Sequence, residues 1–158
     1  MEPQSRLVPI LQKNLTLNLC YNVRVAQDAL SDESGTVVIH LAPDPGSTSL
    51  YRGTRYPVPV ERVRSWTLKD FLGRVGAQAV DPAKVDIEGA EYRVFMPAGE
   101  VLRSGILRNI LLDCHETILR RRGLFPEQLH GHLLACGYRL DTSLGPSVYE
   151  FSQLQMRP

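Results

Sequence analysis

One run in the middle of the chain, residues 84–91, constrains the fold more than any other segment. Small or apolar residues alternate with charged ones from Ala83 to Glu88, which is the two-residue period of a β-strand. Gly89 permits a tight turn, and the residues after it have the pattern of a helix start. The sequence therefore predicts a strand that brings Asp86 and Glu88 to its carboxyl end, directly before a helix. Ligands of open α/β sheets bind beyond the carboxyl ends of the strands.

These carboxylates also allow simpler interpretations. Glu88 and Glu91 would each contribute about 0.3–1 kcal/mol if they only faced the positive end of the helix dipole, and Asp86 would then be a turn residue. Asp86 and Glu88 would also suit Mg²⁺ or Ca²⁺, which prefer oxygen ligands. No further cluster of oxygen ligands lies nearby in the sequence, so we predict no metal site.

Length and composition indicate one globular domain that spans residues 1–158. The formal net charge of +1 gives no overall field that would attract nucleic acid or an anionic membrane, so neither is expected as a partner. No apolar run approaches the ~20 residues of a membrane span. The three cysteines are far apart, which favours free thiols in a reducing cytoplasm. The sequence leaves the oligomeric state open.

The first half of the chain alternates between helix and strand signals. A helical pattern begins near Ser5, which is the candidate N-cap, and Pro9 suits a first turn. Strands are predicted at 22–26, at 36–41 and around 58–63, with a loop at 43–49. Residues 66–72 have the apolar stripe of a helix, with Thr67 or Ser65 as its N-cap.

The second half continues this alternation. Residues 110–112 form an apolar run that is typical of a parallel strand buried on both faces, and His115 follows it. Asp86 and His115 are therefore expected at the carboxyl ends of adjacent strands, facing one cleft. Pro126 suits the first turn of a helix that ends at Gly137. Strands at 138–140 and 148–151 predict an antiparallel end to the sheet.

The central run, K-V-D-I-E-G-A-E, resembles the K-I-D-V-E-G-A-E signature of the FkbM-type S-adenosylmethionine-dependent methyltransferases. Residues 67–71 likewise resemble the T-L-D-D-F helix of that family, although Lys69 replaces the first acid. The resemblance covers almost the whole chain. It implies an α/β fold with a Rossmann-like class I methyltransferase sheet, mostly parallel with an antiparallel C-terminal strand. It also implies S-adenosyl-L-methionine as the cofactor and O-methylation of a small-molecule or glycan hydroxyl.

The resemblance assigns cofactor-binding residues as well. Glu2 matches the acidic residue whose carboxylate accepts hydrogen bonds from the cofactor ribose. Asp28 and Ala29 lie where the family contacts the adenine, and Asp86 would lie beside the methyl donor. Without the resemblance, Glu2 is equally consistent with a disordered terminal residue, and Asp28 with the cap of a turn.

The same resemblance implies the catalytic residues. Asp86 would sit next to the reacting methyl group, and Glu88 or His115 would receive the proton of the acceptor hydroxyl. Direct displacement of the sulfonium methyl by a substrate oxygen would gain most of its rate from proximity and orientation.

No G-x-G motif occurs among the twelve glycines. In the family, a first strand and its glycine-rich turn hold the methionine end of the cofactor, and here they would precede Met1. We therefore expect a partial methyltransferase domain that lacks this strand and loop. Losing the strand would remove more than ~6 kcal/mol of burial, so the alternative is a non-catalytic truncated remnant that acts as an interaction module. A nicotinamide-dependent oxidoreductase is disfavoured by the missing G-x-G-x-x-G.

Overall fold

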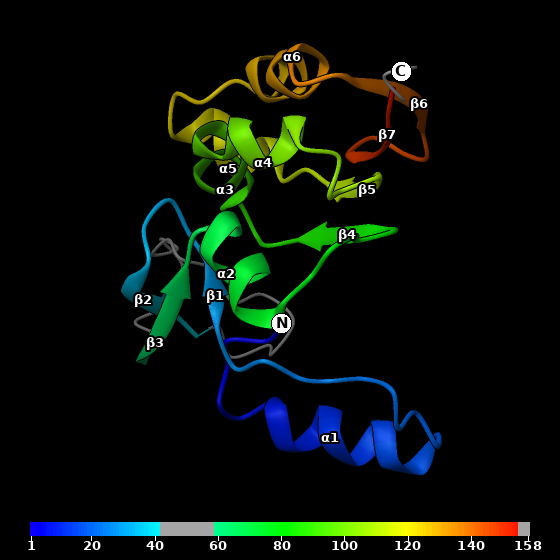
Figure 1. Ribbon diagram of the computed structural model, residues 1–158. Coiled ribbons are helices and arrows are strands. Elements are labelled where there is room, and N and C mark those ends of the chain that lie inside the picture. The colour runs from blue at the N-terminus through cyan, green and yellow to red at the C-terminus, as the bar shows by residue number, and fades with distance from the viewer. Residues whose placement is uncertain (42–58, 155–158) are drawn as a thin grey trace.

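The computed structural model of the protein describes residues 1–41 and 59–154, so the loop predicted at 43–49 lies outside the described residues. Its strands form a three-stranded sheet and a four-stranded sheet, and α3 to α6 gather around the latter (Figure 1). In chain order the elements are α1 (Val8–Leu17), β1 (Ala29–Leu30), β2 (Gly35–His40), β3 (Val60–Trp66), α2 (Leu68–Val75), β4 (Ala83–Asp86), α3 (Glu91–Phe95), the 3-10 helix η2 (Met96–Ala98), α4 (Gly99–Arg103), β5 (Asn109–Asp113), α5 (Glu116–Arg121), α6 (Pro126–Ala135), β6 (Tyr138–Ser143) and β7 (Val148–Gln153). Within the described part of the chain, no helix is both long and apolar enough to span a membrane.

The three-stranded sheet has the order β1-β3-β2, with β1 parallel and β2 antiparallel to β3. The strands predicted at 36–41 and around 58–63 are confirmed as β2 and β3. The strand predicted at 22–26 is wrong, because these residues form no strand and β1 begins at Ala29. Val23, on the apolar face of that predicted strand, is 48% exposed. A run of alternating apolar and polar residues forms a strand only where its apolar face has a surface to pack against.

The four-stranded sheet has the order β4-β5-β7-β6, and in it only β4 and β5 are parallel. The prediction of one mostly parallel sheet is therefore wrong, since the described strands form two mixed sheets. Part of the reason is the connection between β6 and β7, residues 144–147, which is too short for the crossover that a parallel pair needs. The antiparallel C-terminal strands that we predicted are confirmed.

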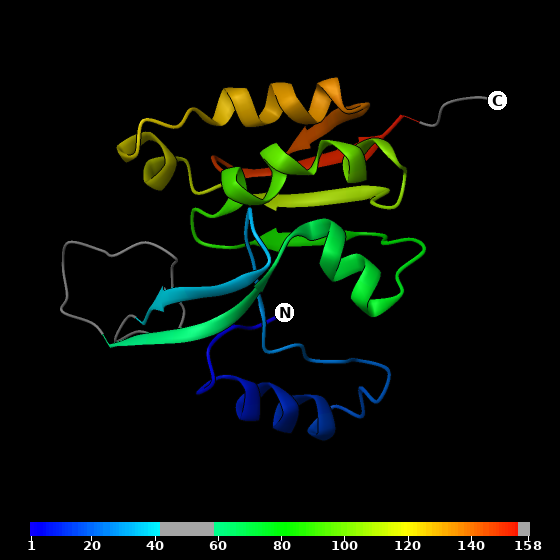
Figure 2. The same ribbon diagram turned by 60° about the vertical axis from the view of Figure 1, so that its left-hand side comes forward.

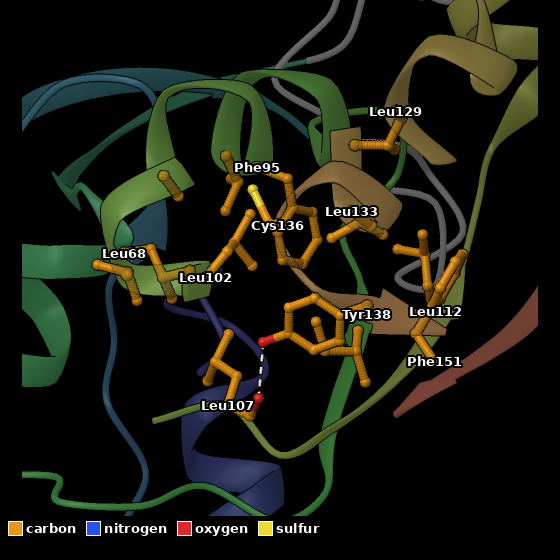
Figure 3. Close-up of a cluster of buried hydrophobic side chains, with 14 of the residues drawn as sticks. Leu68, Phe95, Leu102, Leu107, Leu112, Leu129, Leu133, Cys136, Tyr138 and Phe151 are labelled. Atoms are coloured by element: carbon orange, nitrogen blue, oxygen red, sulfur yellow. Dashed lines mark hydrogen bonds between the residues drawn. The ribbon is translucent and has the colours of Figure 1, made fainter. Parts of the chain in front are cut away.

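The main core lies where the four-stranded sheet meets the helices, and each helix from α2 to α6 contributes to it. Ile110 and Leu112 of β5 are fully buried there, whereas Leu111 between them is only partly buried. Figure 3 shows the ring of Tyr138 inside this cluster, with its hydroxyl donating a hydrogen bond of 2.6 Å to the carbonyl of Leu107. The helix predicted from Pro126 is confirmed as α6, which packs Leu129 and Leu133 into the core.

Helix α1 lies at the opposite end of the molecule from α6 (Figure 2) and has no buried residue. Pro9 sits in its first turn as predicted, but Ser5 is not its N-cap. The helix begins later, after Leu7, and no side chain caps it. The backbone N–H of Ser5 instead donates to the carboxylate of Glu61, at 3.2 Å from each oxygen.

A charged contact joins the two sheets. Asp32, in the turn between β1 and β2, accepts hydrogen bonds from Arg93 of α3, at 2.6 Å from Nη2 and 3.0 Å from Nε. The Arg93 guanidinium holds the pKa of the Asp32 carboxyl below its usual range. The start of α2 lies beside this turn, because the hydroxyl of Ser34 accepts a hydrogen bond from the N–H of Thr67. These contacts fix the three-stranded sheet against α2 and α3.

Candidate functional site

The turn after β4 has an unusual backbone. Glu88 and Gly89 both have left-handed conformations, with φ of 52° and 93°. Gly89 is required for a second reason, since a Cβ there would lie 2.5 Å from Cγ2 of Ile118. Glu88 adopts this conformation although it has a side chain, which costs free energy. Such strained residues cluster at functional sites, so the backbone itself marks Glu88.

His115 reaches this turn because β4 and β5 are parallel and in register, with Asp86 opposite Asp113. Two residues beyond β5, the imidazole Nε2 of His115 lies 3.4 Å from Oε2 of Glu88 and 3.9 Å from Oδ1 of Asp86. The prediction that Asp86 and His115 occupy the ends of adjacent strands is therefore confirmed. All three proposed catalytic side chains are brought together.

Glu91 holds the other side of the imidazole. Its side chain is fully buried, and Oε1 lies 2.9 Å from Nδ1 of His115 and accepts a hydrogen bond from the Gly89 N–H at 3.1 Å. Among the described residues, Oε2 of Glu91 has no hydrogen-bond partner. The hydrogen bond with Glu91 raises the pKa of His115 to about 9, although burial of the ring opposes the rise. His115 therefore carries a proton at neutral pH.

Sequence reasoning gave Glu91 only a helix-dipole role and missed this contact. A signal was available in the spacing: Glu91 lies three and four residues before Val94 and Phe95, which are both buried. It therefore shares the inward face of α3 with them. An acid on the apolar face of a helix needs a buried partner, and His115 is that partner here.

The two carboxylates nearest to Nε2 differ in their surroundings. Partial burial raises the pKa of Glu88, and the neighbouring His115 opposes this. Asp86 is more exposed, and its Oδ2 pairs with Nζ of Lys84 at 3.0 Å. One ligand atom from each of Asp86, Glu88 and His115 lies within 4.8 Å of the others, so the three could hold a metal ion together. Sequence reasoning saw no third ligand because His115 follows Glu88 only after β5.

Apart from Asp86, the residues predicted to bind the cofactor lie in or beside the three-stranded sheet. Glu2 is fixed at both backbone and side chain: its N–H donates to the carbonyl of Ala26 at 3.0 Å, and its Oε1 accepts from the N–H of Gln4 at 2.8 Å. Asp28 is buried, and Ala29 begins β1. The cofactor-binding roles of Glu2, Asp28, Ala29 and Asp86 stay predictions.

Two cavities lie elsewhere on the molecule. One of about 570 Å³ is lined by Arg93, Arg121, Arg122 and Leu124. The other, of about 220 Å³, lies between the β1–β2 turn, α2 and the α3–α4 segment. Neither is lined by the side chains around His115, so the shared cleft that we expected there is not among them. The carboxyl ends of β4 and β5 are distinguished by the charged side chains that meet there.

Comparison with known proteins supplies one match. Residues 1–140 match the family model described as "Methyltransferase FkbM domain". This range contains every residue of the cluster around His115 and the predicted cofactor-binding residues, and it ends within β6. No curated protein and no solved structure matches the chain.

Proposed function

Because the chain belongs to the FkbM methyltransferase family, we propose that it binds S-adenosylmethionine and transfers the methyl group to a hydroxyl oxygen of a small molecule or glycan. The observation that carries this proposal is the contact of His115 with Asp86 and Glu88 of the family motif, with His115 held by the buried Glu91. When bound, the cofactor supplies an electrophilic methyl group on a positively charged sulfonium.

The charges around the cluster suit such a cation. Three carboxylates, those of Asp86, Glu88 and Glu91, surround two positive groups, the protonated His115 and Lys84. The carboxyl ends of β4 and β5 therefore have a net negative charge at neutral pH. Opposite charges attract most strongly where water is partly excluded, and Glu91 and His115 are largely buried.

Glu88 is the proton acceptor in this mechanism. The Glu88 carboxylate would accept the proton of the acceptor hydroxyl, while bound S-adenosylmethionine would supply the methyl group to the hydroxyl oxygen and leave as S-adenosylhomocysteine. Partial burial raises the pKa of Glu88, which makes the carboxylate a stronger base. His115 is less suited to accept the proton at neutral pH because it already carries one. It instead holds the carboxylates in position.

The first experiment measures cofactor binding and methyl transfer for Glu88→Gln and Asp86→Asn. We expect Glu88→Gln to lower turnover by roughly 10²–10⁴-fold, the usual contribution of general base catalysis, with little effect on cofactor affinity. Asp86→Asn should lower turnover by about 10–100-fold, because a hydrogen bond to a charged group contributes about 1.5–3 kcal/mol. Calorimetric titration gives the affinity. Formation of S-adenosylhomocysteine with a panel of sugar and alcohol acceptors gives the turnover.

The matched control is Glu116→Gln. Glu116 follows His115 directly, but its carboxylate accepts a hydrogen bond from Tyr149 and pairs with Arg120 instead of facing the cluster. Its turnover should equal that of the natural chain. Unchanged turnover in Glu88→Gln would remove Glu88 from the reaction. A natural chain that binds no S-adenosylmethionine would contradict the proposed function and favour the interaction module.

A further inference from the structure

We propose that Asp86, Glu88 and His115 bind a divalent transition-metal ion, such as Mn²⁺ or Zn²⁺, at the carboxyl ends of β4 and β5. Each of the three side chains offers one ligand atom, and these atoms lie within 4.8 Å of one another. The site uses the same side chains as the proposed methyl transfer. Binding of the ion is nevertheless a separate property, which the chain has or lacks whatever reaction it catalyses.

The distances fit a metal with tetrahedral or related coordination. Two ligands that are each ~2.0–2.2 Å from a tetrahedral metal lie ~3.3–3.6 Å apart. Nε2 of His115 and Oε2 of Glu88 are 3.4 Å apart, which falls within this range. Oδ1 of Asp86 is 3.9 Å from the same nitrogen. Asp86 is exposed enough to close that gap by a small rotation of its side chain, since 41% of it is accessible.

The environment of His115 is an independent observation in favour of a metal. A metal-binding histidine usually donates its other ring N–H to a carboxylate, which fixes the tautomer and the orientation of the ring. Glu91 provides this arrangement: Oε1 lies 2.9 Å from Nδ1, so Nε2 faces Asp86 and Glu88. The Glu91 side chain is fully buried, and no residue that the structure describes donates a hydrogen bond to its Oε2. A buried carboxylate with an unpaired oxygen is costly, and a nearby cation would offset this cost.

The backbone of Glu88 is strained within this cluster. Glu88 holds its carboxylate in the cluster from a left-handed conformation that glycine would adopt more readily. A ligand bound to the Glu88 carboxylate would offset the free-energy cost of this backbone conformation.

The ligand set selects the class of ion. Two carboxylates and one imidazole combine the oxygen ligands favoured by Mn²⁺ with the nitrogen ligand favoured by Zn²⁺, and no thiolate is included. Three protein ligands would leave at least one coordination position open, as in catalytic metal sites. If the proposed function also holds, an acceptor hydroxyl could occupy that position, and the metal would lower its pKa. That extension rests on the proposed function, whereas binding of the ion does not.

The test titrates the full chain with Mn²⁺ and follows the electron paramagnetic resonance signal of the free ion, which is lost on binding. We expect one binding site per chain, and competition by Zn²⁺. Asp86→Asn and His115→Gln should each weaken binding by more than tenfold. Glu91→Gln should weaken it by roughly 10–100-fold, although Glu91 is not a ligand, because it orients His115. Glu116→Gln is the control and should bind as the natural chain does.

Circular dichroism shows which variants are folded. If His115→Gln fails to fold, Asp86→Asn decides, because an exposed carboxylate contributes little to packing. No binding at millimolar Mn²⁺, or equal binding by Asp86→Asn and the natural chain, would overturn the proposal. S-adenosylmethionine binding is measured separately in the presence of EDTA, so the metal site and the proposed function can fail independently.

Discussion

Helix α1 and the helices around the four-stranded sheet have similar apolar spacing in the sequence but very different burial. Ile10 and Leu17 of α1 are 54% and 69% exposed, and none of its ten residues is buried. Phe95 of α3 and Leu129 of α6, in contrast, are buried in the main core. The comparison shows that apolar periodicity predicts a helix without predicting what the helix packs against. A ten-residue helix is marginal without tertiary packing, so we expect the two regions to respond differently to mutation.

The largest difference should appear when an apolar side chain is truncated in each region. Phe95→Ala should lower the free energy of unfolding by about 3–5 kcal/mol, because Phe95 is only 1% exposed and its loss leaves a cavity. Ile10→Ala in α1 should change it by less than about 0.5 kcal/mol, since that side chain is already in solvent. Urea unfolding of both variants gives the two values. Equal losses would show that α1 is packed in solution.

A smaller difference is expected for single hydroxyl groups. Tyr138→Phe removes the 2.6 Å hydrogen bond to the Leu107 carbonyl inside the core, which should cost about 1–3 kcal/mol. Tyr21→Phe, just after α1, should have no measurable effect because Tyr21 is 78% exposed. Thermal unfolding of the two variants is the measurement. A stable Tyr138→Phe would mean that the Leu107 carbonyl finds another donor.

The smallest effect concerns the starts of α1 and α2. Thr67 caps α2, where its Oγ1 accepts a hydrogen bond of 3.1 Å from the Asp70 N–H. Thr67→Ala should therefore cost about 1 kcal/mol. Ser5→Ala should be neutral, because only the backbone of Ser5 makes the contact with Glu61. Urea unfolding with fixed m-values can resolve this difference. A loss of stability in Ser5→Ala would restore Ser5 as a capping residue.

Much of the fold was predictable where local signals decide it. The alternation at Ala83–Asp86, the Thr67 cap and the proline at the start of α6 all act within a few residues, and the structure confirms each. The division into two mixed sheets was not predictable, because strand pairing is decided between distant residues. The strand expected at 22–26 failed for the same reason: its period was correct, but no partner lies beside it in the described sheets.

In the site, too, local signals were predictable from the sequence and contacts between distant residues were not. The central motif identified Asp86 and Glu88, and the apolar run before His115 placed this histidine at the end of the next strand. The distance between these two carboxylates and His115 depends on the parallel register of β4 and β5, which no local sequence pattern predicts. The pairing of Glu91 with His115 also depends on that register, although the buried position of Glu91 was readable from the helical spacing.

The close approach of Gly89 to Ile118 has a consequence for redesign of this site. A hydrogen on Gly89 and the branched side chain of Ile118 leave no room for a methyl group between the turn and α5. Ile118 therefore packs directly against the turn that carries Glu88. An engineer who wishes to fit a larger ion or a bulkier acceptor would begin with the apolar Ile118. Shortening that side chain adds space while every charge in the cluster is kept.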